Sequence, residues 1–339
     1  MSAAGSRREV LVTVGRPNAP EGAEPAEGAH PVELAGVAEG AEPVELAEGA
    51  ELAGKGAGDV SGEIEHKISL LEERLAGLGS VVVAFSGGVD SALLAWTANR
   101  VLGDRALAAT AVSVSLAPAE RRWCESLAAE WGMQWREVFT REMDDPLYLA
   151  NGTDRCYHCK SALMDALEPL AAPGGARIAL GVNVDDLGEF RPGQEAARER
   201  GAVFPLVDAG MTKAEIRLAA RMAGLSVWDK PAMPCLASRI SHDLRVDGAK
   251  LDAVGRAEAA LAGMGFREVR VRHHGDIARL EFPVADLARA LELREGLVGA
   301  VQEAGFRYVT LDLEGLRSGN LAVTAIGRAI QGRRLQAER

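Results

Sequence analysis

The run from Val81 to Ser91 constrains the fold of this chain more than any other stretch. Residues 81–85 are apolar and predict a short buried strand, and residues 92–96 begin a helix. The residues between them are Ser-Gly-Gly-Val-Asp-Ser. Glycines let a backbone approach a ligand, and a helix N-terminus offers unpaired N–H groups and the positive end of its dipole. The sequence therefore predicts an anion-binding loop between a strand and a helix.

The side chains of this loop indicate which anion it binds. Ser86 and Ser91 add hydroxyl donors beside Gly87 and Gly88, whereas Asp90 is out of place next to an anion. We expect Asp90 to hold Mg²⁺ against a phosphate chain. The loop lacks the Gly-Lys-Ser/Thr ending of a Walker loop. It resembles the loop of the ATP pyrophosphatase (PP-loop) superfamily, whose members cleave ATP between the α and β phosphates; the alternative is an ordinary strand–helix turn.

The order of elements around the loop predicts an α/β fold. Strands expected at 81–85, within 106–116, at 135–139 and at 177–181 alternate with helices expected at 63–77, 92–102, 118–131 and 159–170. Such alternation indicates a parallel sheet with helices on both faces, which binds its ligand at the carboxyl ends of the strands. The glycine loop and Gly181 both lie at that edge, so Gly181 joins the predicted ATP site.

Three regions of different composition predict the domain organisation. Residues 1–61 are rich in Ala, Glu, Gly and Pro, which predicts a disordered tail. Residues 62–240 hold the PP-loop domain, in which Thr212 and Glu215 form a capping box that begins a helix. Residues 241–339 predict a smaller α+β domain, with helices at 249–264 and 284–303 and strands at 268–273, 277–281 and 308–313.

Charge and cysteine content narrow the class of protein. The net charge is −11, and residues 1–61 hold eleven acidic against four basic side chains, so the rest is only mildly acidic. This argues against a dominant nucleic-acid surface. No apolar run approaches the length of a membrane span, and the first residues lack a secretory h-region. Four cysteines in 339 residues do not form a disulfide scaffold, so we expect a cytoplasmic protein.

Three of the cysteines form a candidate metal site. Cys156 and Cys159 form a Cys-x-x-Cys pair, and Cys235 lies in Met-Pro-Cys-Leu-Ala-Ser-Arg. The pair alone is compatible with a redox dithiol, half a zinc site or part of an iron–sulfur site. Three thiolates suit a [4Fe–4S] cluster with one iron left open, and unrelated thiols are the alternative. The fourth, Cys124, is expected to be a packing thiol.

Several segments that occur in one order resemble the LarE family of ATP-dependent sulfur transferases, over about residues 65–320. The segments are Ser86–Ser91, Arg155–Lys160, Gly181–Gly193, Thr212–Arg217, Lys230–Arg239, Arg270–Arg272 and Ala278–Glu281. The family helps to build the nickel-pincer nucleotide of lactate racemase. The segments after Arg239 and from Gly315 to Asn320 diverge from the pattern expected of the family.

The resemblance implies a reaction on a small nucleotide substrate. ATP adenylates a carboxylate of a pyridinium that carries two carboxylates and a ribose phosphate, and pyrophosphate leaves. A sulfur nucleophile then displaces AMP to give a thiocarboxylate. Loop amides and Mg²⁺ can stabilise the charge that develops on the pyrophosphate. The family also implies a homo-oligomer, while the charge and the short apolar runs predict neither a nucleic acid nor a membrane as partner.

The resemblance also implies roles for single residues. Lys160, Ser238 and Arg239 would bind the phosphate or carboxylates of the substrate, as would Arg272, because a guanidinium fork suits both anions. Glu281 would orient a base or a metal. Cys235, Arg272 and Glu281 form the expected catalytic set. The alternative for each charged residue is a surface or interdomain salt bridge. Asp185 and Asp186 either contact the nucleotide or metal or cap a turn.

The family divides over the source of the sulfur. Some members sacrifice the cysteine that matches Cys235 and are left with dehydroalanine. Others have cysteines that match Cys156 and Cys159 and hold a [4Fe–4S] cluster whose extra sulfide is the donor. This chain has all three cysteines, which favours the cluster type with Cys235 as a surviving ligand.

Other classes of protein share parts of this pattern. A PP-loop tRNA thiolase combines such a loop with cysteines, but a basic groove or an RNA-binding module would be expected there. An amide-forming PP-loop synthetase with a structural metal would not need three cysteines near the loop. A non-catalytic iron–sulfur sensor would not need Asp90.

Overall fold

Four parallel strands form the sheet that carries the glycine loop. The computed structural model describes residues 57–188, 192–242 and 244–317. The strands are β1 (Val81–Ala84), β2 (Ala106–Val112), β3 (Trp135–Phe139) and β4 (Arg177–Leu180), and their order in the sheet is β3-β2-β1-β4. Because β1 and β4 are neighbours, the glycine loop after β1 and the segment after β4 lie side by side.

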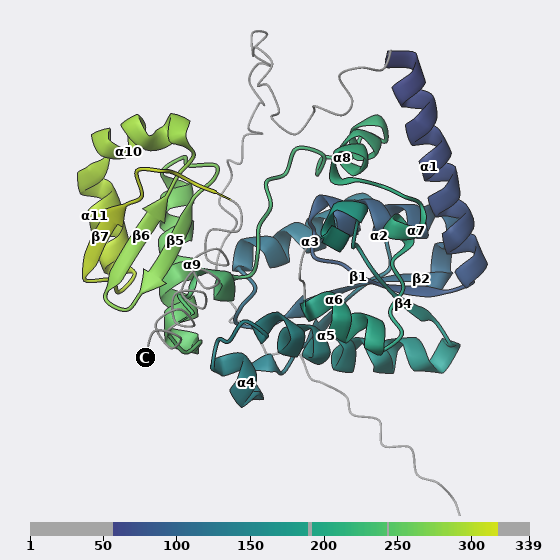
Figure 1. Cartoon of the computed structure of the whole chain (residues 1–339), viewed down its shortest axis with the longest axis horizontal. Coiled ribbons are helices and arrows are strands. Elements are labelled where there is room, and N and C mark those ends of the chain that lie inside the picture. The colour runs from purple at the N-terminus through teal and green to yellow at the C-terminus, as the bar shows by residue number, and fades with distance from the viewer. Residues whose placement is uncertain (1–56, 189–191, 243, 318–339) are drawn as a thin grey trace, which may run out of the picture. The chain divides into compact units, whose positions relative to one another are not determined.

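Helices cover both faces of this sheet, as the alternating pattern predicts (Figure 1). On β1, Val81 and Val83 pack into one hydrophobic cluster and Val82 into another, because successive strand residues point to opposite faces. The first cluster includes helices α1 (Ala57–Leu78), α2 (Val89–Leu102), α3 (Pro118–Glu130) and α8 (Lys213–Met222), and the second includes α5 (Arg155–Ala171) and α6 (Pro192–Glu199). The predicted α/β fold with a parallel sheet is confirmed.

Two helix boundaries differ from the sequence-based expectation. The helix expected around 159–170 begins earlier, at Arg155, so both cysteines of the Cys-x-x-Cys pair lie on it. Its first residues, Arg-Cys-Tyr-His-Cys-Lys, are too polar to give an apolar period. The helix expected at 284–303 is a 3₁₀ turn followed by α10 (Leu287–Glu292) and α11 (Arg294–Glu303), separated at Leu293.

The capping box predicted at Thr212 is present and places a lysine. The Thr212 hydroxyl accepts a hydrogen bond from the backbone N–H of Glu215, and the Glu215 carboxylate accepts one from the N–H of Thr212 at 2.8 Å. Lys67 of α1 forms an ion pair with the same carboxylate at 2.6 Å. The start of α8 is therefore fixed, and Lys213 occupies its first position.

A second sheet lies in the C-terminal part of the chain. Strand β6 (Ile277–Glu281) is central, with β5 (Arg270–His274) antiparallel to it and β7 (Tyr308–Leu311) parallel to it. Helix α9 (Gly248–Gly263) packs on this sheet through one hydrophobic cluster. These elements give the α+β arrangement that the sequence predicts, whereas the domain boundary at residue 240 stays a prediction.

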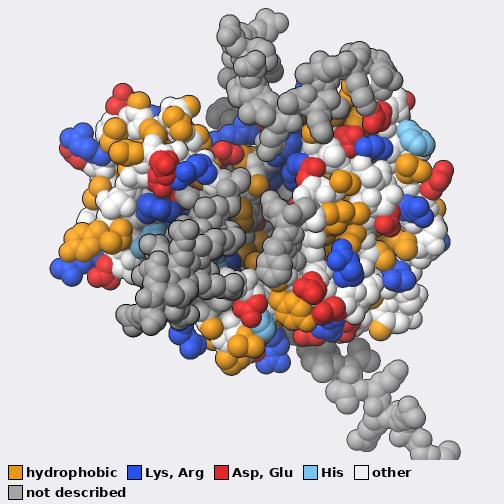
Figure 2. Space-filling model, in the orientation of Figure 1, with side chains coloured by type: hydrophobic (Ala, Val, Ile, Leu, Met, Phe, Trp, Pro, Cys, Tyr) orange, Lys and Arg blue, Asp and Glu red, His pale blue; other side chains and the backbone are white. Residues whose placement is uncertain are grey.

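Most of the predicted N-terminal tail lies outside the described residues, because the description begins at Ala57. Helix α1 begins at Ala57, earlier than the helix expected at 63–77. Within the described ranges, no helix combines the length and apolar character that crossing a membrane requires. On the face drawn in Figure 2, acidic and basic side chains of the described residues are interspersed.

Gly181 offers a test of the junction between β4 and the glycine loop. A Cβ atom at Gly181 would lie 2.7 Å from the backbone nitrogen of Ser91, at the start of α2. We expect Gly181→Ala to lower the free energy of unfolding by about 1–3 kcal/mol, because backbone must move to admit the methyl group.

The matched control is Gly174→Ala, since a Cβ there would meet no atom within 4 Å. Urea denaturation should show a change of less than about 0.5 kcal/mol for this control. Equal stability of the two variants would contradict the close approach of Gly181 to α2.

Candidate active site

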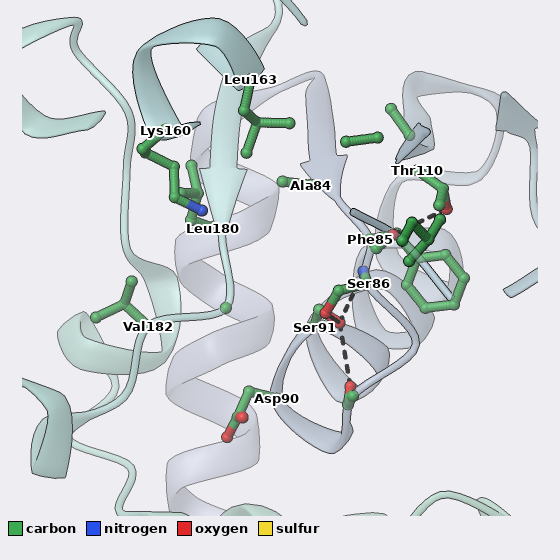
Figure 3. A pocket seen from close by; sticks show the side chains of 15 residues that line it. Ala84, Phe85, Ser86, Asp90, Ser91, Thr110, Lys160, Leu163, Leu180 and Val182 are labelled. Carbon is green, nitrogen blue, oxygen red and sulfur yellow. Dashed lines mark hydrogen bonds between the residues drawn. The ribbon is translucent and has the colours of Figure 1, made fainter. Parts of the chain in front are cut away.

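The glycine loop is held closed by its own serines. The backbone N–H of Ser86 donates to the Ser91 hydroxyl at 3.2 Å, and that hydroxyl donates to the Gly88 carbonyl at 3.1 Å (Figure 3). The two serine hydroxyl oxygens lie 3.1 Å apart. Gly87 has a φ of +69°, a conformation that side chains rarely adopt. The loop therefore reaches the N-terminus of α2 in one defined shape.

A cavity of about 210 Å³ lies at the carboxyl end of the parallel strands (Figure 3). Ser86, Gly88 and Asp90 of the glycine loop line it, as does Gly181 after β4. Lys160 enters its wall from α5. The predicted ATP loop and one predicted substrate residue thus share one cavity, at the edge of the sheet where the fold class predicts a ligand.

Asp90 takes part in a network of charged and polar groups. One carboxylate oxygen accepts a hydrogen bond from the Asn183 amide at 3.2 Å, and the other pairs with the Lys213 ammonium. Asp185 accepts a hydrogen bond from the Lys213 backbone N–H at 2.6 Å, and Asp186 accepts one from the Asn183 N–H. Asp185 and Asp186 therefore stabilise the turn after β4. Asp90 forms its ion pair with the ammonium of Lys213.

The structure brings Cys156, Cys159 and Cys235 together. Cys156 and Cys235 are exposed and Cys159 is half-buried. Charges on Cys235 and Cys156 both act on the Cys159 thiol, and all three thiols act on Lys160. Burial, followed by the charges of Cys235 and Glu142, raises the pKa of Cys159 to about 12. Burial lowers the pKa of Lys160, and the charges of the cysteines oppose that shift.

Cys124 is separate from this cluster. It is fully buried on α3, and its sulfur would lie 2.9 Å from a Cβ placed at Gly87. Burial raises its pKa to about 11. These contacts agree with the packing role that the sequence predicts for this thiol.

Single metal ions and clusters make different demands on these residues. Within the described part of the chain, no three His, Cys, Asp or Glu side chains converge on one ion position. In a [4Fe–4S] cluster each cysteine binds a different iron, so its ligands stand further apart than the ligands of one ion. The three thiols act on the Lys160 ammonium, and their binding of a cluster stays a prediction.

Buried polar contacts hold the segment that carries Cys235. The Arg239 side chain is 1 % exposed and binds both carboxylate oxygens of Glu258 on α9, at 2.9 and 3.2 Å. It also donates to the Pro234 carbonyl at 2.6 Å and to the Ser238 hydroxyl at 3.0 Å. Arg239 and Ser238 thus shape the turn after Cys235, and their predicted binding of substrate stays a prediction.

Comparisons with known proteins decide the family. The chain is 36% identical, over 257 residues, to the pyridinium-3,5-bisthiocarboxylic acid mononucleotide synthase of Lactiplantibacillus plantarum. The match covers 75% of this chain and 93% of that protein. This chain belongs to the LarE family of sulfur transferases.

Two further relatives of this LarE-family chain are uncharacterised. A protein of Synechocystis sp. is 44% identical over 76% of the chain and 97% of its own length. A protein of Methanocaldococcus jannaschii is 23% identical over 70% of the chain and 91% of its own length. No family model matches the chain.

In this LarE-family chain, Arg272 and Glu281 form a buried ion pair between β5 and β6. The guanidinium donates to one Glu281 oxygen at 2.8 and 2.9 Å, and Arg279 donates to the other at 2.9 Å. Arg272 also donates to the Ser238 carbonyl at 3.0 Å. The pair therefore supports the turn that follows Cys235, whereas its predicted catalytic role is untested.

Sequence reasoning missed the residues that join the cysteine segments. Buried Arg155, one residue before Cys156, donates to the Asn151 side chain at 2.5 Å and to the Ala237 carbonyl at 2.8 Å. Asn151 donates in turn to the Ser241 carbonyl at 2.9 Å. Both lie between the strand expected at 135–139 and the helix expected at 159–170, and no spacing rule connects them to residues 237–241.

Glu142 is a second residue that the sequence did not single out. Its carboxylate is buried beside Cys159 and Tyr148, and one oxygen accepts a hydrogen bond from the Ser115 hydroxyl at 3.3 Å. The other oxygen has no hydrogen-bond partner within the described residues. A buried carboxylate near the thiols disfavours their anionic form, which is the direction of the shift at Cys159.

The reactivity of the cysteines in this LarE-family chain tests the arrangement. In metal-free protein at pH 8, iodoacetamide should modify exposed Cys156 and Cys235 much faster than Cys159, because the thiolate is the reactive form. With a pKa near 12, Cys159 is protonated at pH 8, so its rate should rise about tenfold per pH unit below that value.

Peptide mass spectrometry after timed labelling measures each cysteine in one sample. Buried Cys124 is the internal control and should stay unmodified while the chain is folded. Modification of Cys159 as fast as that of Cys235 would contradict the burial of Cys159.

Proposed function

We propose that this chain adenylates a carboxylate of a pyridinium biscarboxylate mononucleotide with ATP and converts it to a thiocarboxylate. The synthase of Lactiplantibacillus plantarum, by its name, makes the bisthiocarboxylic acid mononucleotide. The structural observation that carries the proposal is the position of Lys160. It lines the cavity of the glycine loop and lies on α5, the helix that carries Cys156 and Cys159.

The glycine loop serves the activation step. A carboxylate is a poor electrophile, so its oxygen first attacks the α phosphorus of ATP, and the bond to the β phosphate breaks. Backbone N–H groups at the start of α2 receive the departing pyrophosphate, which carries the negative charge that develops. Asp90 would hold Mg²⁺, which supplies positive charge at the phosphates. Lys213, paired with Asp90 in this structure, would then be free for the phosphates.

The cysteine cluster serves the second step. The sulfur nucleophile attacks the acyl carbon, the carbon–oxygen bond to AMP breaks, and the thiocarboxylate leaves with the new carbon–sulfur bond. Lys160 lines the cavity of the glycine loop and also interacts with the three cysteines. It can bind the AMP phosphate or a carboxylate of the substrate. Cys156, Cys159 and Cys235 would hold a [4Fe–4S] cluster, whose bound sulfide supplies the sulfur.

The alternative donor is the sulfur of Cys235 itself. Its thiolate would form a thioester with the acyl group, and loss of the α proton would break the bond from Cβ to sulfur. The products would be the thiocarboxylate and dehydroalanine at position 235. Cys235 is exposed, as such an attack requires, but this route gives no role to Cys156 and Cys159.

The setting of the enzyme follows from the same residues. We propose a reducing, cytoplasmic location, because a cluster and free thiols need one. The resemblance supports a homo-oligomer, and the acidic composition supports a small-molecule substrate rather than a nucleic acid.

The activation step is tested through pyrophosphate release. With ATP, Mg²⁺ and the pyridinium biscarboxylate mononucleotide, the wild-type chain should release pyrophosphate and AMP in equal amounts. Asp90→Asn should slow release by about 100-fold or more, because loss of one charge-stabilising group costs that much at such sites. Asp252→Asn, which alters an exposed ion pair on α9, is the control and should not change the rate. Full activity of Asp90→Asn would remove the metal role of Asp90.

The sulfur source is tested by iron content and mass. Protein purified without oxygen should contain about four irons per chain, and Cys156→Ala or Cys159→Ala should lose them. Cys124→Ala is the control and should retain the iron, since Cys124 lies apart from the cluster. Intact mass after turnover should leave Cys235 unchanged. Loss of one H₂S from the chain would instead establish the sacrificial route.

A further inference from the structure

The carbonyl of Gly87 receives two hydrogen bonds from outside the glycine loop. The indole Nε1 of Trp123, on α3, donates to it at 3.1 Å, and the ammonium of Lys230 donates to it at 3.2 Å. The loop has its own internal bonds through Ser86 and Ser91, so this external pair is an additional constraint.

The direction of this carbonyl decides the direction of the next N–H. A trans peptide is planar, and its carbonyl and the following N–H point to opposite sides. Because the Gly87 carbonyl points to Trp123 and Lys230, the N–H of Gly88 points away from them. Gly88 lines the cavity and is the N-cap residue of α2. The external pair thus fixes the direction of an N–H donor at a residue that lines the cavity.

Lys230 is fixed and neutralised in this position. Its ammonium forms an ion pair with Glu120 of α3 at 2.7 Å and lies 5.1 Å from the centre of the Trp123 ring. The two side chains of the ion pair are only 14 % and 15 % exposed. A cation with a carboxylate, a ring and a carbonyl around it is not free to bind phosphate directly.

Close contacts with α3 leave no room for a side chain at Gly87. A Cβ at Gly87 would lie 2.9 Å from both the Trp123 ring and the Cys124 sulfur. The positive φ of Gly87 allows its carbonyl to accept the bonds from Trp123 and Lys230. Another orientation of this peptide would break both bonds.

We propose that Lys230 and Trp123 are positioning residues for ATP, which turn the N–H of Gly88 toward the pyrophosphate portion of the nucleotide. The inference rests on the proposed function and assigns to these two side chains a task in its first step. Lys230 also begins the segment that carries Cys235, and its carbonyl accepts a hydrogen bond from Arg217 at 3.1 Å. The same segment thus contacts the ATP loop at one end and carries the sulfur site at the other.

Direct binding measurements on the full chain test this role without turnover. Lys230→Met and Trp123→Phe each remove one donor to the Gly87 carbonyl and keep most of the apolar contact. Titration calorimetry should show about tenfold weaker binding of ATP and of pyrophosphate for each, as expected for a lost hydrogen bond near a charge. Binding of AMP, which lacks the pyrophosphate portion, should change less than about twofold.

Arg100→Met is the matched control. Arg100 also lies over a tryptophan ring, at 4.6 Å from Trp96, and pairs with a carboxylate, Glu72 at 2.7 Å, but it contacts no loop carbonyl. This variant should bind ATP as the wild type does. Glu120→Gln separates positioning from direct charge, because a lysine that acted on ATP by charge alone would bind it more tightly once Glu120 is neutral.

The results of these binding measurements either support the positioning role of Lys230 and Trp123 or overturn it. Unchanged ATP and pyrophosphate binding in Lys230→Met and Trp123→Phe would overturn the inference and leave the proposed function intact. An equal loss of AMP binding, or tighter ATP binding in Glu120→Gln, would also overturn it. A wild-type chain that binds neither ATP nor pyrophosphate would overturn the inference together with the proposed function.

Discussion

The buried guanidinium of Arg155 is the interaction on which the candidate site depends. It links the first turn of α5, which carries Cys156 and Cys159, to the Ala237 carbonyl in the turn after Cys235. These segments are far apart in the sequence, and Cys159 packs against the hydrophobic cluster that contains Leu236 and Ala237, next to Cys235. A buried donor left without its acceptor costs about 1–3 kcal/mol, so the contact favours one relative placement of the two segments. The cluster of cysteines follows from that placement.

Two segments connect the cavity of the glycine loop with the three clustered cysteines. Helix α5 contributes Lys160 to the cavity of the glycine loop and two cysteines to the cluster. The segment from Lys230 to Arg239 contacts the Gly87 carbonyl through its first residue and carries Cys235. Buried ion pairs of Arg239 with Glu258 and of Arg272 with Glu281 then hold the turn after Cys235. Arg239, Arg272 and Glu281, for which the resemblance implies substrate or catalytic roles, thus also form buried ion pairs in this structure.

The sequence predicted those parts of the protein that rest on local patterns. The strand, loop and helix around residues 81–102 are set by an apolar run, two glycines and helical spacing, and the structure confirms them. The capping box at Thr212 is likewise local. The pairing of Lys213 with Asp90 and the contact of Arg155 with Ala237 join segments without a shared period, so no spacing rule predicts them. The early start of α5 was missed because its first turn is polar.

In the reaction that we propose, the glycine loop makes an acyl adenylate, and the cysteine site then completes the exchange of oxygen for sulfur. The most direct measurement follows the carboxylate oxygen. When the substrate carboxylate carries ¹⁸O, we expect one ¹⁸O atom in the phosphate of AMP for each thiocarboxylate formed. Thiocarboxylate formed with unlabelled AMP, or with the label in pyrophosphate, would contradict this reaction.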